Sequence, residues 1–137
     1  MNRIKYDLTT MKFISLFESL SNAHVKDCIN GDVLIFVVDE GEIGKAVGKQ
    51  GVHVKRMSAL LKKPLKIVEF SSDVCAFIKN YIYPLQAKEI HNENNSITIL
   101  GPDTKTKGML IGRDGRNLQM LKSIVGRYFA IEDIKVG

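Results

Sequence analysis

The sequence predicts an α+β fold built from two similar units in tandem. Three observations carry this prediction: a globular composition, an internal repeat, and apolar residues that alternate between helical and strand spacing. Of the 137 residues, 45% are hydrophobic and 26% charged, and no apolar run approaches the ~20 residues of a membrane span. The first residues lack the apolar stretch of a signal peptide, so we expect a cytoplasmic protein without a membrane partner.

The repeat is clearest around a glycine-rich segment. Residues 44–51 read GKAVGKQG and residues 108–115 read GMLIGRDG, which sets an offset of 64 positions. The same offset matches the apolar positions that follow, and upstream it matches residues 33–35 with residues 97–99. The sequence therefore predicts two domains, residues 1–71 and 72–137.

In the first unit, residues 11–20 have apolar side chains at helical spacing, and Thr9 or Thr10 can cap this helix. We expect strands at 23–29 and 33–38 around an Asn30-Gly31-Asp32 turn, because the second of them is rich in β-branched residues. The remaining elements expected are a short helix at 41–47, an amphipathic helix at 52–62 with Val54, Met57, Leu60 and Leu61 inward, and a strand at 65–70.

The second unit repeats this order. We expect a helix after Ser72 or Asp73, strands at 86–91 and 96–100 around a 93–95 turn, helices at 104–111 and 116–127, and a strand at 129–136. The order is α-β-β-α-α-β twice, and residues 70–72 alone separate the last strand of the first unit from the helix cap of the second. Because a ~60-residue domain is marginally stable by itself, we expect the two units to pack as a rigid pair.

Positive charge is concentrated in two segments. Residues 44–68 contain seven basic residues and no acid, and residues 104–127 contain six basic residues and one acid, Asp114. These 13 residues are most of the 20 basic residues of a chain whose net charge is +5. A single basic run is usually a solvated helix face, but two with the same internal layout favour a polyanion, above all nucleic acid.

Several chemistries are excluded by the motifs that are missing. Residues 44–50 lack the spacing and the hydroxyl of a Walker loop, and the glycines do not follow the dinucleotide pattern. Cys28 and Cys75 have no metal-binding spacing, and we interpret both as buried small hydrophobic residues. No motif of a catalytic nucleophile, base or metal cluster is present. We therefore expect no catalytic residue, cofactor, metal or small-molecule substrate.

The remaining motif is Gly-x-x-Gly, at residues 48–51 and 112–115. Glycines let two backbones approach closely, and a loop that feeds a helix N-terminus suits a phosphate. Lys49 and Arg113 add a cation to each loop. One such motif is weak evidence, but here it occurs twice, each time after an apolar pair and before an amphipathic helix.

This arrangement resembles the KH family of RNA-binding domains, in the type II topology, and the resemblance extends from about Asp7 to Val136. The tandem arrangement and short linker resemble the archaeal NusA-like transcription factors. The resemblance implies that about four nucleotides of single-stranded RNA cross each unit. The implied RNA-binding residues are Lys45, Val47, Gly48, Lys49, Gln50, Gly51, Val54, Lys55 and Arg56 in the first unit, and Lys107, Ile111, Gly112, Arg113, Asp114, Gly115, Arg116 and Leu118 in the second.

The same resemblance implies an apolar groove for the bases, lined by residues such as Val47, Val54 and Ile67, or Ile111, Leu118 and Ile131. Two interpretations stay open for these residues: each is half core and half groove, or all of them belong to the core. Two polar residues at the loops have simpler interpretations. We expect Asp114 to cap the helix that follows it, and His53 to be a solvated surface residue.

The function implied is a non-catalytic, single-stranded RNA-binding factor in transcription elongation, termination or antitermination, with the transcription machinery as a further partner. Two alternatives remain: a KH protein of ribosome assembly, and an adaptor that binds protein through the same fold. Two intact cationic loops weigh against the adaptor.

Overall fold

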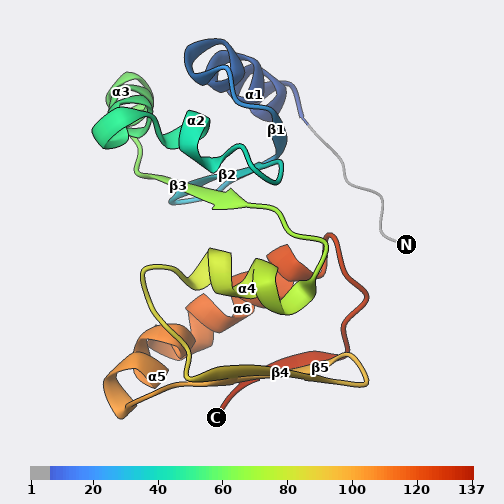
Figure 1. The fold of residues 1–137 in the computed structure, drawn as a ribbon. Coiled ribbons are helices and arrows are strands. Elements are labelled where there is room, and N and C mark those ends of the chain that lie inside the picture. Colours follow the sequence, from blue (N-terminus) through green and yellow to red (C-terminus); the bar gives the residue numbers. More distant parts are fainter. Residues whose placement is uncertain (1–6) are drawn as a thin grey trace. The chain divides into compact units, whose positions relative to one another are not determined.

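The computed structural model describes residues 7–137, which divide into two compact units between Ser71 and Ser72. The first unit contains α1 (Leu8–Ser21), β1 (Val25–Asn30), β2 (Leu34–Val38), α2 (Ile43–Val47), the 3₁₀ turn η1 (Lys49–Gly51), α3 (Val52–Leu61) and β3 (Leu65–Glu69). Strand β2 is central in its sheet, antiparallel to β1 and parallel to β3. The helices of this unit lie over one face of the sheet (Figure 1).

The second unit has the same order of elements. It contains α4 (Val74–Ile82), β4 (Glu89–Glu93), β5 (Ser96–Leu100), α5 (Thr104–Ile111), the 3₁₀ turn η2 (Arg113–Gly115), α6 (Arg116–Val125) and β6 (Asp133–Val136). Strand β5 is antiparallel to β4 and parallel to β6, and the helices again lie over one face (Figure 1). The α+β class is confirmed.

Capping differs from the prediction at the first helix. The cap of α1 is Asp7, whose side chain accepts a hydrogen bond from the Thr10 backbone N–H at 2.8 Å. The prediction of Thr9 or Thr10 is wrong, because Asp7 has the extended backbone of a capping residue and Thr10 lies three residues further on. Helix α4 begins after Asp73, one of the two predicted caps, which accepts from the Ala76 N–H.

Two strands of the second unit begin later than predicted. Strand β4 covers 89–93 instead of 86–91, because Asn94 and Asn95 form a two-residue turn with φ of 53° and 67° and the strands pair up to it. The last strand begins at Asp133 instead of Phe129, because the chain first packs against α4. The Phe129 ring lies 5.8 Å from that of Phe77, and helix α6 has already ended at Val125.

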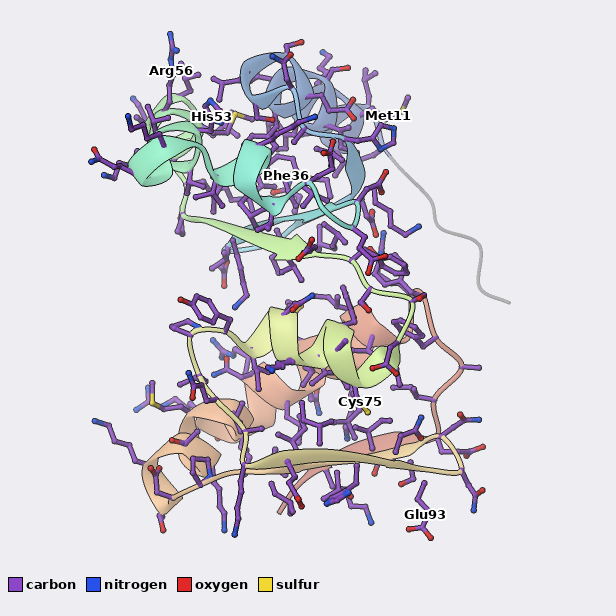
Figure 2. All side chains as sticks on the ribbon, viewed as in Figure 1. Met11, Phe36, His53, Arg56, Cys75 and Glu93 are labelled. Atoms are coloured by element: carbon purple, nitrogen blue, oxygen red, sulfur yellow. The ribbon has the colours of Figure 1, made fainter. Side chains whose placement is uncertain are left out.

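The core of the first unit lies between β2 and the helices. Leu34, Phe36 and Val38 point into it, and the Phe36 ring stacks on that of Phe17 with 4.6 Å between centroids (Figure 2). The apolar spacing of α3 predicts a wider buried face than the helix has in the structure. Leu60 was expected to point inward but is 59% exposed, whereas Met57 is fully buried.

In the second unit, Ile97 and Ile99 are fully buried and alternate with half-buried Ser96 and Thr98. This alternation corrects the repeat upstream of the loops. The 64-residue offset pairs Ile97 with Val33, yet Val33 is 39% exposed. Burial pairs Ile97 with Leu34 and Ile99 with Phe36 instead, at an offset of 63, because all four side chains are fully buried. A one-residue slip exchanges the two faces of a strand.

The cysteines differ from each other. Cys28 is buried as expected, but Cys75 is half-buried, so the prediction is wrong there. Burial and the neighbouring Asp73 carboxylate raise the pKa of the Cys75 thiol, which makes it a poor thiolate.

Candidate nucleic-acid interface

The two Gly-x-x-Gly turns have almost the same backbone. The first glycines, Gly48 and Gly112, have φ of 77° and 75° with ψ of 171° and 173°. The third residues, Gln50 and Asp114, have φ of 57° and 58°, a left-handed conformation that non-glycine residues seldom adopt. Two different sequences therefore form the same turn.

Each first glycine has a second reason to lack a side chain. A Cβ at Gly48 would lie 2.7 Å from Nδ1 of His53, and one at Gly112 would lie 2.6 Å from Cγ of Asn117. The prediction that glycine permits a close approach holds here, and the group that approaches in this structure is a side chain of the next helix.

The helices that follow the turns begin without a side-chain cap. The N-caps of α3 and α6 are Gly51 and Gly115, and neither helix has a side-chain capping bond. In contrast, α1, α4 and α5 each begin with an aspartate that caps them, Asp103 in the case of α5. The positive end of the helix dipole at α3 and α6, which no side-chain carboxylate caps, suits an anion such as a phosphate.

The basic side chains around the first turn are solvent-exposed. Lys49, Lys55 and Arg56 are exposed, and Arg56 points away from the unit (Figure 2). Lys45 is also exposed and forms an ion pair with Glu42 at 3.5 Å. The lysine end of this long contact is solvent-exposed, so the pair is weak and leaves Lys45 able to contact an anion.

The second turn has fewer available cations. Arg113 and Arg116 are exposed beside it. Lys107 is half-buried, with its stem next to Gly101, and Lys122 donates to Asp133 at 2.9 Å, a bond that lowers the pKa of Asp133. The two basic segments are therefore less alike in space than in sequence.

Apolar residues flank both turns. Val47, Val54 and Leu118 are half-buried, and Ile111 is 36% exposed, so none of the four belongs to the fully buried core. Ile67 is partly buried and packs against the first core. Ile131 in the second unit is half-buried as well.

Two expectations for polar residues at the turns are wrong. Asp114 does not cap α6, because its own backbone is left-handed and Gly115 occupies the cap position. Its carboxylate is therefore an exposed anion within the loop. His53 is half-buried instead of freely solvated, and its Nδ1 lies 2.7 Å from the Lys45 carbonyl oxygen.

Sequence reasoning missed Asn117, which occupies the corresponding place in the second unit and donates from Nδ2 to the Met109 carbonyl oxygen at 2.8 Å. The signal that could have found it is positional. Both residues come two positions after the second glycine of their motif, and both can donate a side-chain hydrogen bond.

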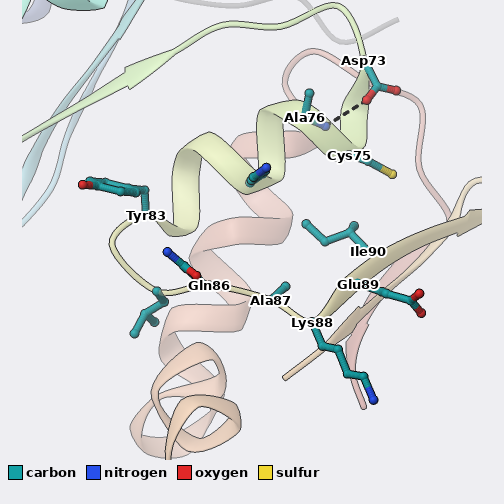
Figure 3. Close-up of a pocket in the computed structure, with 11 residues that line it drawn as sticks. Asp73, Cys75, Ala76, Tyr83, Gln86, Ala87, Lys88, Glu89 and Ile90 are labelled. Atoms are coloured by element: carbon teal, nitrogen blue, oxygen red, sulfur yellow. Dashed lines mark hydrogen bonds between the residues drawn. The ribbon is translucent and has the colours of Figure 1, made fainter. Parts of the chain in front are cut away.

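A separate cavity of about 560 Å³ lies in the second unit, between α4 and the segment that leads into β4 (Figure 3). Its lining includes Tyr83 and Gln86 after the helix and Ile90 on the strand. None of the residues predicted to bind RNA lines it. The cavity is therefore distinct from the Gly-x-x-Gly turns.

Residues 7–137 contain no cluster of three or more His, Cys, Asp or Glu side chains able to hold a metal ion. Within the same range, no helix combines the length and the apolar character that a bilayer crossing requires.

Comparison with known proteins identifies relatives along nearly the whole chain, although no family model matches it. It is 33% identical to the probable transcription termination protein NusA of Methanococcus vannielii, over 98% of this chain and 80% of the relative. The corresponding protein of Methanocaldococcus jannaschii is 31% identical, over 96% and 75%. The chain belongs to the archaeal NusA family.

The NusA relative from Halobacterium salinarum is 30% identical and is covered over 92% of its length. The crystal structure of APE1850 has the same fold, with a TM-score of 0.75 and 27% identity over 96% of this chain and all of that one. The resemblance to archaeal NusA-like proteins is therefore confirmed.

Proposed function

We propose that this NusA-family chain is a single-stranded RNA-binding factor that acts in the cytoplasm in transcription elongation, termination or antitermination. In this proposal each unit is a type II KH domain that binds one RNA segment. The observation that carries the proposal is the pair of Gly-x-x-Gly turns with matching torsions, each of which leads into a helix whose N-terminus no side chain caps.

The element order supports the KH assignment. Both units follow α-β-β-α-α-β, with an antiparallel hairpin and a parallel third strand, and both have their turn between the second and third helices. A phosphate at the open end of α3 would meet Lys49 on the turn, and one at α6 would meet Arg113. The bases would then face Val54 or Leu118.

The proposed mode of action is binding without chemistry. The RNA backbone is held by amides and cations, and bound RNA presents its bases to the apolar groove. The names of the relatives support transcription as the process. The transcription machinery is the partner proposed beyond RNA.

The proposal is tested by fluorescence anisotropy of a labelled, unstructured RNA over a range of salt concentrations. With about four to six phosphate contacts, the slope of log affinity against log salt should be about −3 to −4. Duplex DNA of equal length is the control and should bind more weakly. A flat salt response, or equal affinity for the duplex, would contradict the proposal.

We also propose that the two units associate as a rigid pair. Support comes from β2, in which Leu34, Phe36 and Val38 face the core of their own unit, so Ile35 and Val37 point to the opposite face. Strands that are apolar on both faces need cover on both. One cooperative thermal transition of the intact chain is expected, and two transitions that match the isolated halves would contradict the pairing.

A further inference from the structure

Helices α2 and α5, which precede the turns, each end with a carbonyl that accepts no hydrogen bond from within the helix. The last bond of α2 runs from the Gly48 N–H to the Gly44 oxygen at 3.0 Å, and that of α5 from the Gly112 N–H to the Gly108 oxygen at 2.8 Å. The extended ψ of the two glycines then turns the chain out of the helix. The next carbonyl along is therefore an orphan of the helix C-terminus.

A side chain from the following helix satisfies that carbonyl in both units. In the first, His53 Nδ1 lies 2.7 Å from the Lys45 oxygen. In the second, Asn117 Nδ2 donates to the Met109 oxygen at 2.8 Å. Because a carbonyl oxygen can only accept, the bonded nitrogen of His53 must carry the hydrogen. Two different residue types thus form one bridge, at the same place, across two turns.

The bridging side chains also cover the first glycine of each turn, since the imidazole and the amide occupy the space that a Cβ would need. The turn is therefore held from both sides. The hydrogen bond joins the helices before and after it, and the side chain packs on the glycine between them. The left-handed residue of each turn, Gln50 or Asp114, lies within this closed loop of contacts.

We propose that His53 and Asn117 are positioning residues that hold the two Gly-x-x-Gly turns in the conformation that receives an RNA phosphate. The inference rests on the proposed RNA binding and assigns to these residues a role in the turns. Their contribution is preorganisation: a turn that is already fixed loses little conformational freedom when the phosphate binds.

The test uses the intact chain and the same labelled RNA, with a matched pair of variants in each unit. His53→Ala removes the first bridge and should weaken RNA binding about fivefold. It should also make the salt slope less steep by about 0.7, because one phosphate contact is lost. His53→Asn transplants the amide of the second unit and should restore the affinity to within about twofold. Asn117→Ala and Asn117→His form the reciprocal pair.

Thermal melting of each variant separates loss of the turn from loss of the fold. His91→Ala, which removes an exposed imidazole on β4 that bonds to Glu89, is the control and should bind RNA as the unchanged chain does. Unaltered affinity and slope in both alanine variants, or no rescue by the exchanges, would contradict the positioning role of the two side chains without contradicting the proposed RNA binding. An unchanged chain that binds no single-stranded RNA would overturn the proposed function, and this inference with it.

Discussion

The two units of this chain have matching turns but differ in the sheets behind them. In the first, β2 reads LIFVV and is buried at every position, whereas in the second, β5 alternates buried isoleucines with half-buried polar residues. The helices before the turns differ as well, because α2 has five residues and α5 has eight. The 64-residue offset places Gly41 at a position that is helical in α5. Because Gly41 has φ of 85°, which is not helical, α2 begins only at Ile43.

This difference teaches that the turn is the more constrained part of the unit. Torsions at the corresponding turn residues agree within a few degrees, although Gln50 and Asp114 differ in charge. Outside the turn the units vary more. The loop between β1 and β2 has one residue more than the loop between β4 and β5, and α2 is three residues shorter than α5. Matching torsions in two different sequences indicate that the turn admits fewer conformations than the sheet behind it.

The largest expected effect tests the register of the strands. Ile97→Ala should lower the free energy of unfolding by about 2–5 kcal/mol, because it leaves a cavity in the second core. Val33→Ala, at the position that the 64-residue repeat equates with it, should change the stability by no more than about 0.5 kcal/mol. Chemical denaturation measures both. Equal losses would show that the strands follow the 64-residue offset after all.

The next effect ranks the two turns. Replacing Lys49 and Gln50 together by Asp should weaken RNA binding about tenfold or more, or about 1.4 kcal/mol, because two anions would face the RNA backbone. Position 50 is left-handed, a conformation that Asp tolerates well, so the melting temperature should stay nearly the same. Arg113→Asp should weaken binding less, since the second turn already contains Asp114. A larger loss from Arg113→Asp would reverse the ranking.

A smaller effect concerns the helix starts. Asp103→Ala should lower the urea midpoint of unfolding, because Asp103 caps α5 through the Thr106 N–H at 2.7 Å. Asp39→Ala should change the midpoint less, because Asp39 caps no helix and its carboxylate contacts the solvent-exposed His24 ring. Urea unfolding at neutral pH distinguishes them, and similar losses would contradict the assignment of the caps.

The cap also has a pH dependence with a defined sign. The hydrogen bonds from Thr106 hold the pKa of Asp103 below its ordinary value. Its contribution to stability is therefore fully present above the ordinary carboxyl pKa and is lost as the pH falls through the lowered one. The stability difference between Asp103→Ala and the unchanged chain should shrink in acid.

The smallest effect removes the anion of the second turn. Asp114→Gln copies the residue of the first turn and should raise RNA affinity about twofold to threefold at low salt, because a carboxylate no longer opposes the phosphate. The effect is best measured in the Lys49→Asp, Gln50→Asp background, where binding depends on the second unit. A decrease in affinity would mean that Asp114 contacts the RNA favourably.

Patterns that rest on local physics were predicted closely. The bounds of α5 and β5 match the prediction, because an aspartate before Thr104 and a β-branched alternation at 96–100 are short-range signals. Errors arose where distant residues decide. Phe77 holds residues 128–129 out of a strand, and Leu60 is exposed although its spacing is that of a buried residue.

By itself, the sequence determined the repeat, the α+β class, the two Gly-x-x-Gly turns and the segregation of positive charge, because each of these follows from residue types at fixed spacing. Tertiary structure alone decided the one-residue shift between the strands, the half-burial of Lys107, and the bridges from His53 and Asn117 to carbonyls eight residues before them. Glycine torsions bring those groups together, and a hydrogen bond between groups on two helices depends on the angle at which the turn joins them.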